Sequence, residues 1–277
     1  MSPQRARPSV RSKVPGRAAR APRLVIVGAG RLGGALALTL QQAGWPVQVL
    51  VRSPEARRRA RRLGLALADA QALREAARAL APRLGSRTAL VHCAGALALE
   101  ALGEQGLRPV GSFHPLCAVS DARDSLAGHA VALSSRTPAL LRALRQLARA
   151  TQLRPIHVPE AGRAAYHAGA VLSAGGLVAL AAAAVQALQT AGLSEEDALA
   201  ALLPLMRSAL RGVEARGLAG GLTGPVRRGD AGVVAAHLAA LTPEVVEVYR
   251  PLSRRALALA GPQLAPGARA ALAKLLG

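Results

Sequence analysis

The feature that most constrains the fold is a glycine-rich turn between an apolar run and a helical pattern. Residues 24–28 form an apolar run that predicts a buried parallel strand. A helical pattern then ends at Gly44 and Pro46, and a second apolar run covers residues 47–51. The turn matches G-x-G-x-x-G and consists of Gly28, Ala29, Gly30, Arg31, Leu32 and Gly33. Strand, turn, helix and second strand are the context that this dinucleotide-binding motif requires.

Each glycine of the turn has a separate role in such a site. Gly28 allows the tight turn, Gly30 lets backbone N–H groups approach a pyrophosphate, and Gly33 lets the helix pack closely on the strand. The positive end of the helix dipole then faces the phosphates. The alternative is a glycine-rich turn in another kind of α/β protein. We predict that residues 28–33 bind a dinucleotide cofactor.

The end of the second strand favours NADP over NAD as that cofactor. An NAD enzyme usually places Asp or Glu there to bond the ribose 2′-hydroxyl, but no acidic residue precedes Glu55. Arg52 and Ser53 occupy the strand end instead, and residues 57–59 are all arginine. Guanidinium and hydroxyl groups suit a 2′-phosphate. The alternative is that these arginines form a solvated helix face.

The net charge of +21 raises the possibility of a nucleic-acid partner. Only four aromatic residues are present, however, and base stacking needs aromatic platforms. The charge is almost all arginine and is spread along the whole chain, which is typical of a GC-rich genome. The two cysteines are isolated and have no metal-ligand spacing. We expect no specific nucleic-acid binding, no membrane association and no metal site.

Strand and helix patterns alternate up to residue 158, and helical patterns alone follow. Alternation of this kind predicts an α/β fold with a doubly wound parallel sheet. The expected domains are a basic disordered tail at 1–22, a Rossmann-like domain at 23–158 and an all-helical domain at 159–277. Strands are expected at 63–69, 88–93, 108–114, 130–134 and 154–158, and helices at 54–63, 70–84, 96–105 and 138–150. Further helices are expected at 160–191, 194–216, 233–241, 243–260 and 266–276, with a glycine-rich linker at 217–232.

The first long helix of the second half is apolar enough over residues 168–191 to suggest a membrane span. It consists mostly of Ala and Gly and contains Ser173, Gln186 and Gln189. We interpret it as the spine of the helical domain or a subunit interface. The prediction is a cytoplasmic protein that forms a homodimer through this domain.

Several motifs in a fixed order give the chain a family resemblance. They are VIVGAGRLGGALA (25–37), VHCAGAL (91–97), GSFHPL (111–116), YHAGAVLSAGGLVAL (166–180), LTGPVRRGD (222–230), HLAAL (237–241) and YRPLSRRALALA (249–260). The chain resembles proteins in which a Rossmann-like domain precedes the helical domain of unknown function 2520. These are related to pyrroline-5-carboxylate reductase and the 6-phosphogluconate dehydrogenase-like enzymes. The resemblance implies NADP-linked oxidation or reduction of a small molecule.

The chain departs from the family pattern at two places. The segment between the second strand and the strand ending at Asp69 is shorter than in relatives, so the sheet is expected to lack one edge strand. Relatives also tend to have Ser-Asn where this chain has Ser173 and Ala174, so a polar amide is missing. Both departures bear on turnover more than on the fold.

Residues at strand ends and at the start of the long helix are the candidates for chemistry. We expect His114, His167 and Ser173 to be catalytic, with His92 and Gly95 at the cofactor. Ser112, Thr223 and Arg227 are the candidates for substrate binding. The structural alternatives are hydrogen bonds to loop backbone for His114, a helix-start role for His167 and shaping of the following loop for His92. For the Thr223 cluster the alternative is helix capping by Asp230. A catalytic lysine is excluded, because the only lysines, Lys13 and Lys274, lie near the termini.

These residues predict an NADP-dependent oxidoreductase that acts on a small carbonyl or imine in the cleft between the two domains. The nicotinamide would transfer the hydride, and the protein would orient the substrate and supply a proton. One alternative is a non-catalytic NADP-binding or sensor protein. Another is a polyanion binder that depends on the basic charge alone.

Overall fold

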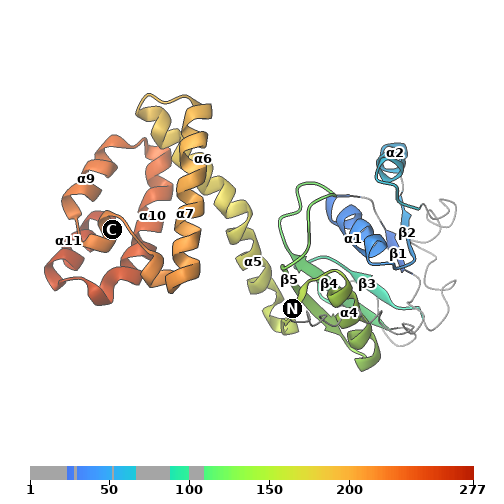
Figure 1. The fold of residues 1–277 in the computed structure, drawn as a ribbon. Helices are drawn as coiled ribbons and strands as arrows, with labels where there is room; N and C mark the ends of the chain where they lie inside the picture. Colours follow the sequence, from blue (N-terminus) through green and yellow to red (C-terminus); the bar gives the residue numbers. More distant parts are fainter. Residues whose placement is uncertain (1–23, 28–29, 52, 67–87, 100–108) are drawn as a thin grey trace, which may run out of the picture. The chain divides into compact units, whose positions relative to one another are not determined.

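The computed structural model describes residues 24–27, 30–51, 53–66, 88–99 and 109–277 (Figure 1). The predicted roles of Gly28, Ala29 and Arg52 lie outside these residues, as do Asp69 and the helix expected at 70–84. The chain divides into two compact units, Met1–Ala168 and Gly169–Gly277. This division lies inside a helix, later than the change of pattern at residue 158.

The first unit begins with the strand–helix–strand order that the glycine turn predicts. Strand β1 (Leu24–Val27) and strand β2 (Val47–Leu50) pair in parallel, with Leu24 opposite Val47. Helix α1 (Arg31–Gln42) connects them, and helix α2 (Pro54–Arg62) follows β2. The Ser53 hydroxyl caps α2 by accepting a hydrogen bond from Ala56 N–H at 3.1 Å. Of the strand expected at 63–69, Ala66 lies beside β2, since its carbonyl accepts from Val49 N–H at 2.7 Å.

A second sheet has the order β3 (Leu90–His92), β4 (Val110–Leu116), β5 (Ala130–Ser135) and β6 (Arg154–His157). The pairs β3–β4 and β5–β6 are parallel, but β4 and β5 are antiparallel. This pair departs from the all-parallel prediction. The connection at 117–129 contains only turns and bends, so the chain reverses directly into β5. Helix α4 (Pro138–Ala150) provides the crossover from β5 to β6 (Figure 1).

One apolar core joins these elements. Ala35 and Leu36 of α1 share a cluster with Phe113 of β4, Val131 of β5 and Leu144 of α4. Phe113 and Val131 are completely or almost completely buried, so the second sheet and α1 belong to one hydrophobic layer. A glycine permits a close approach in this layer. A Cβ added at Gly34 would lie 2.6 Å from the Cβ of Ala122 in the β4–β5 connection.

The rest of the chain is helical, as predicted. A short 3-10 turn, η2 (Glu160–Gly162), leads into α5 (Arg163–Ser173), and α6 (Gly175–Thr190) follows after a break at Ala174. The single helix expected at 160–191 is therefore three segments. The further elements are α7 (Glu195–Gly221), α8 (Pro225–Arg228), α9 (Ala231–Ala240), α10 (Pro243–Ala260), η3 (Gly261–Gln263) and α11 (Pro266–Leu276).

The helix start expected at residue 194 and the glycine-rich linker expected at 217–232 have different outcomes. The Ser194 hydroxyl accepts a hydrogen bond from Asp197 N–H at 3.1 Å and so caps α7 as expected. The linker expected from Gly217 is only a kink there. Gly217 has a φ of 70°, which is left-handed backbone that favours glycine, and helical structure continues to Gly221. Val226, Val234 and Leu272 form the centre of a separate small core.

Within the described residues, one helical stretch has the length and composition of a membrane span. It is Glu160–Thr190, with a mean hydropathy of 2.0 in its most apolar window, and 11% of that window is buried. One stretch of this kind is weak evidence for a membrane. Exposed apolar surface of this extent is typical of an interaction surface.

Candidate functional site

The first unit brings two predicted catalytic histidines together. His114 comes from β4, and His167 comes from α5 together with its neighbour Tyr166. His114 Nδ1 and the Tyr166 hydroxyl oxygen are 2.7 Å apart. The His114 ring meets the Tyr166 and His167 rings edge-on, with centroids 5.5 Å and 6.0 Å away. These side chains form what we call the His–Tyr cluster, defined as His114, Tyr166 and His167.

The segment after β3 lies directly against the His–Tyr cluster. A Cβ added at Gly95 would lie 2.5 Å from His167 Nδ1 and 2.8 Å from both Cε1 and Nε2 of His114. Real Cβ atoms do not approach other atoms so closely, so any larger residue would have to displace an imidazole. The sequence assigns Gly95 to the cofactor. The structure gives it a further constraint, which is close contact with both histidines.

Burial favours the neutral forms of His114 and Tyr166. Desolvation lowers the pKa of His114, and electrostatic interactions of its protonated ring with His167, Arg163 and His92 lower it further. Burial raises the pKa of Tyr166 above that of a free phenol. Tyr166 therefore keeps its proton at neutral pH and can donate it to Nδ1 of an uncharged His114. In that arrangement the neutral imidazole carries its own proton on Nε2.

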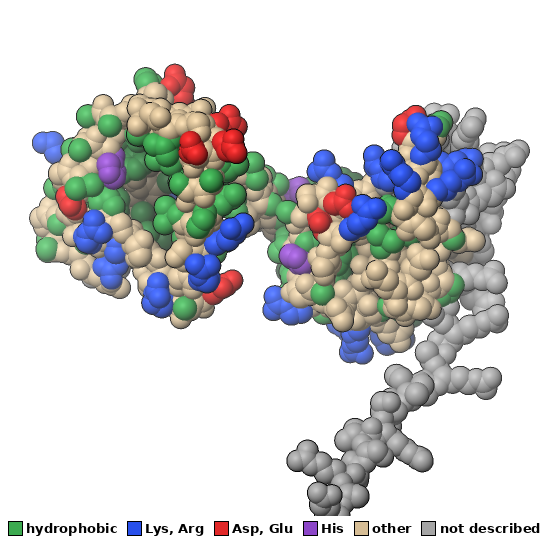
Figure 2. All heavy atoms as spheres, turned by 45° about the horizontal axis from the view of Figure 1, so that its top comes forward, with side chains coloured by type: hydrophobic (Ala, Val, Ile, Leu, Met, Phe, Trp, Pro, Cys, Tyr) green, Lys and Arg blue, Asp and Glu red, His purple; other side chains and the backbone are tan. Residues whose placement is uncertain are grey.

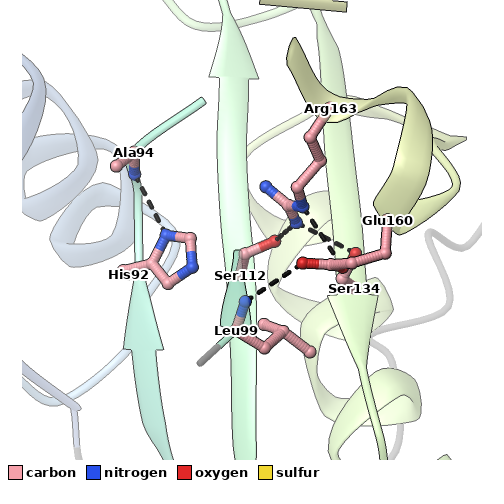
Figure 3. A network of polar contacts seen from close by, with 7 residues as sticks. All are labelled: His92, Ala94, Leu99, Ser112, Ser134, Glu160 and Arg163. Carbon is pink, nitrogen blue, oxygen red and sulfur yellow. Dashed lines mark hydrogen bonds and ion pairs between the residues drawn. The ribbon is translucent and has the colours of Figure 1, made fainter. Parts of the chain in front are cut away.

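His92, at the end of β3, is also held neutral. Desolvation is the main cause that lowers its pKa, and nearby Arg163 adds to the effect. Its Nδ1 accepts a hydrogen bond from Ala94 N–H at 3.3 Å, which orients the ring (Figure 3). Within the described residues, His92 Nε2 and His167 Nδ1 are buried and have no hydrogen-bond partner. Such atoms cost stability unless water or a ligand satisfies them.

A buried arginine lies beside the cluster, and the sequence analysis did not identify it. Arg163 is 3% exposed, and its Nη2 donates to the Ser134 hydroxyl at 3.0 Å and to the Ser112 hydroxyl. Its Nε pairs with Glu160 Oε2 at 3.4 Å, and Glu160 Oε1 accepts from Leu99 N–H at 3.1 Å (Figure 3). The signal was present in R-x-x-Y-H, because this spacing places the three side chains on one helical face.

Two residues predicted to act on the substrate, Ser112 and Ser173, form hydrogen bonds with other groups of the protein. Ser112 is completely buried, and its hydroxyl accepts from Arg163, so it belongs to this internal network. Its role in substrate binding stays a prediction. Ser173 ends α5, and its hydroxyl donates to the Gly169 carbonyl of the same helix at 2.9 Å. This local bond does not bring Ser173 to the His–Tyr cluster. Its catalytic role stays a prediction.

A cavity of about 420 Å³ lies at the N-terminus of α1. Gly30 and Arg31 of the glycine turn line it together with Arg59 and Arg62 of α2. The other lining residues are Leu63, Ser120, Asp121, Ala122 and Arg123. Figure 2 shows the basic side chains gathered over α2. A Cβ added at Gly30 would meet nothing within 4 Å, so the space in front of this glycine is open.

We call the space lined by these residues the arginine cavity, after Arg31, Arg59, Arg62 and Arg123. Its lining suits a phosphate-bearing group. Asp121 is its one acidic residue, and it pairs with Arg123 at 3.8 Å. The remaining guanidinium groups leave the cavity positively charged. Of the predicted residues, Ser53 caps α2, and Leu32 packs partly buried against the core. Gly33 lies in the first turn of α1.

The helical unit has its own cavity of about 670 Å³, at the turn before α8. Thr223 and Arg227, both predicted to bind substrate, line it. Arg227 Nη2 donates to the Gln263 side-chain oxygen, which holds the guanidinium at the cavity wall. The Asp230 carboxylate accepts from Val233 N–H at 3.0 Å and caps α9. This confirms the structural alternative for Asp230.

Comparisons with known families agree with this architecture. Residues 130–256 match the family described as domain of unknown function DUF2520. Residues 24–85 match the family described as ketopantoate reductase PanE/ApbA. The predicted resemblance is therefore confirmed. No curated protein matches the sequence.

Solved structures of low sequence identity share the fold. A Bacteroides fragilis protein provisionally assigned as an NADP oxidoreductase is 23% identical, with a TM-score of 0.70 over 85% of this chain and 97% of that one. A Thermotoga maritima protein is 22% identical, with a TM-score of 0.64 over 87% and 99%. The 1-pyrroline-5-carboxylate reductase of Streptococcus pyogenes is 15% identical, with a TM-score of 0.55 over 92% and 96%. The predicted α/β fold with a helical C-terminal domain is confirmed.

We predict that Gly95→Ala destabilises the protein because its new methyl group would displace His167 and His114. Overpacking of this kind costs about 1–3 kcal/mol in the free energy of unfolding. Gly169→Ala is the matched control, since an added Cβ there meets nothing within 4 Å in the middle of α5. Urea denaturation should show a loss for Gly95→Ala alone. Equal stability of both variants would contradict the close contact.

Proposed function

We propose that the protein is an NADP-dependent oxidoreductase that acts on a small carbonyl or imine compound. The observation that carries the proposal is the half-buried His114–Tyr166 pair beside Gly95, in a chain that has the G-x-G-x-x-G pattern at residues 28–33. The family match of residues 24–85 and the NADP oxidoreductases among proteins of similar fold support it. A bound nicotinamide would supply or accept the hydride.

The arginine cavity is our proposed binding site for the phosphates of the cofactor. The open space at Gly30 would let a pyrophosphate approach the N-terminus of α1. Arg59 and Arg62 on α2 follow the strand end where a 2′-phosphate is usually read, so we assign them to NADP selectivity along with Arg52 and Ser53. His92 and Gly95, with the unpartnered His92 Nε2, are proposed to contact the cofactor.

Within the His–Tyr cluster, His114 is the proposed proton donor. It would release the proton from Nε2 to the oxygen or nitrogen that gains negative charge during reduction. Tyr166 would give its hydroxyl proton to Nδ1 at the same time, so the imidazole stays neutral. Solvent then returns a proton to Tyr166. His167 lies against Gly95, and its unpartnered Nδ1 would be available to a bound molecule.

The nature of the substrate follows from what the chain can offer. A lysine-based hydroxyacid dehydrogenase mechanism has no suitable lysine here, whereas a carbonyl or imine needs only a positioned proton donor. Thr223 and Arg227 line a basic cavity without an acidic lining residue. We propose that they bind an anionic group, such as a carboxylate, of the substrate.

We expect the double variant Arg59→Gln/Arg62→Gln to lose NADPH affinity at least tenfold, while NADH affinity changes less than twofold. The reason is that charge-assisted hydrogen bonds to a phosphate contribute about 1.5–3 kcal/mol each, and NADH lacks the 2′-phosphate. Arg61→Gln is the matched control, because Arg61 lies on the same helix and does not line the cavity. Calorimetric titration of the unmodified protein and both variants with NADPH and with NADH measures these affinities. Equal losses for both cofactors would contradict the assignment.

We expect His114→Ala, His167→Ala and Tyr166→Phe to lower turnover by about 10²-fold or more, the usual contribution of a positioned acid or base. NADPH affinity should stay within a few-fold, because these residues are assigned to proton transfer. His129→Ala, at an exposed position, is the control. The assay follows NADPH oxidation with a panel of cyclic imines and 2-keto acids. Unchanged rates in all three variants would remove the cluster from the chemistry.

We also propose that a second copy of this cytoplasmic chain covers the apolar surface of the helical unit. Leu172 is 73% exposed and Val178 is 71% exposed, and Figure 2 shows hydrophobic side chains gathered in a hollow of this unit. Val178→Asp should therefore convert a dimer into a monomer by light scattering after gel filtration, and Arg142→Asp on α4 should not. A monomeric unmodified protein, or an unchanged dimer in Val178→Asp, would contradict this interface.

A further inference from the structure

We propose that Arg163 is a positioning residue, which fixes the first turns of α5 on the sheet so that Tyr166 and His167 meet His114. It acts on proton transfer through these side chains and does not itself touch the substrate. The functional part of this inference rests on the proposed oxidoreductase activity. The structural part can be tested without turnover.

The contacts of Arg163 join three separate parts of the first unit. Ser112 on β4 and Ser134 on β5 are directly opposite each other in the antiparallel pair, and one guanidinium nitrogen donates to both hydroxyls. The Nε group pairs with Glu160 in the turn before α5. Glu160 in turn accepts from Leu99 N–H in the segment after β3. Figure 3 shows the side chain reaching from α5 toward the two serines.

The spacing on α5 turns this attachment into a constraint on the His–Tyr cluster. Arg163, Tyr166 and His167 occupy positions i, i+3 and i+4 of one helix, so they share a face. The bonds of Arg163 to Ser112 and Ser134 oppose rotation or sliding of α5 relative to the sheet. The Tyr166 hydroxyl can then stay 2.7 Å from His114 Nδ1, two residues along β4 from Ser112.

Arginine suits this position better than lysine would. The guanidinium presents donors in a planar fork, and here it uses Nε for Glu160 and Nη2 for the two serines. A lysine ammonium is a single point charge and could not reproduce these directions. A buried charge of this kind is costly to desolvate and is weak evidence for stability on its own. A role in positioning Tyr166 and His167 explains why a charged Arg163 is buried beside the His–Tyr cluster.

The charge of Arg163 also acts directly on the cluster. The charged or titratable groups around His114 are Arg163, Tyr166 and His167 from α5 and His92 from β3. Arg163 is among the causes that lower the pKa of His114, after burial and His167. Loss of the cation alone would therefore raise the pKa of His114. A positional effect must be separated from this electrostatic one.

Arg163→Lys and Arg163→Gln make that separation. The lysine variant keeps the charge and loses the fork, whereas the glutamine variant loses both. We expect histidine-ring NMR of the full chain to show loss of the His114 Nδ1 hydrogen bond in both variants, and a raised His114 pKa in Arg163→Gln. Turnover should fall at least tenfold in both, with the Kd for NADPH within threefold. Arg145→Gln, at an exposed position on α4, should match the unmodified protein.

Two results would overturn the proposal. In the first, both variants keep the His114 ring signal and the turnover of the unmodified protein. A loss of stability alone would then show that Arg163 has only a structural role. The other is full recovery by Arg163→Lys, which would make the effect electrostatic. If Arg163→Gln does not fold, Ser134→Ala removes one acceptor and should give a smaller change of the same kind. The NMR result stands even if the unmodified protein transfers no hydride.

Discussion

The attachment of α5 to the second sheet through the Arg163 guanidinium is the interaction on which the candidate site depends. It joins a cross-strand pair of serines to the residue that begins the helix, and it brings Glu160 and Leu99 into the same network. The His–Tyr cluster lies within one helical turn of this anchor. A strand histidine and a helix tyrosine therefore meet because a buried charge fixes the helix on the sheet.

Burial determines the chemistry of the cluster once it is assembled. The pKa of His114 is lowered mainly by desolvation, and that of Tyr166 is raised for the same reason, so the pair holds neutral groups with a shared hydrogen bond. A histidine whose pKa is lowered on folding contributes stability above the unfolded pKa and loses it as the pH falls through the folded value. The site should therefore resist mild acid less well than the small core of the helical unit, which is made of Val226, Val234 and Leu272.

Much of the fold could be predicted from local patterns. The β1–α1–β2 order around the glycine turn, the bounds of α4 and the Ser194 cap all depend on apolar spacing and on residues near in sequence. The antiparallel β4–β5 pair was missed, although no helix is expected between residues 114 and 130 and a parallel pair needs a crossover connection there. The break at Ala174 was also missed, because an Ala/Gly-rich stretch keeps its apolar pattern across it.

The sequence singled out two histidines of the His–Tyr cluster but not how the side chains of the candidate site are arranged. Strand ends and the Y-H pair pointed to His114 and His167, whereas the partners of Ser112 depend on which strands are neighbours. Arg163 was missed because arginine is common throughout this chain, so one more carries little signal. The many arginines of α2 also made it impossible to predict which of them line the cavity. That depends on how the helix is rotated about its axis.

The central claim is that the glycine turn and the arginine cavity bind a nicotinamide dinucleotide with a 2′-phosphate. A calorimetric titration of the unmodified protein with NADPH and with NADH tests it most directly. The account predicts NADPH binding at micromolar strength or better and much weaker binding of NADH. Absence of binding for both would contradict it and remove the basis for an oxidoreductase. Tight NADPH binding without hydride transfer to any imine or keto acid would indicate a sensor protein instead.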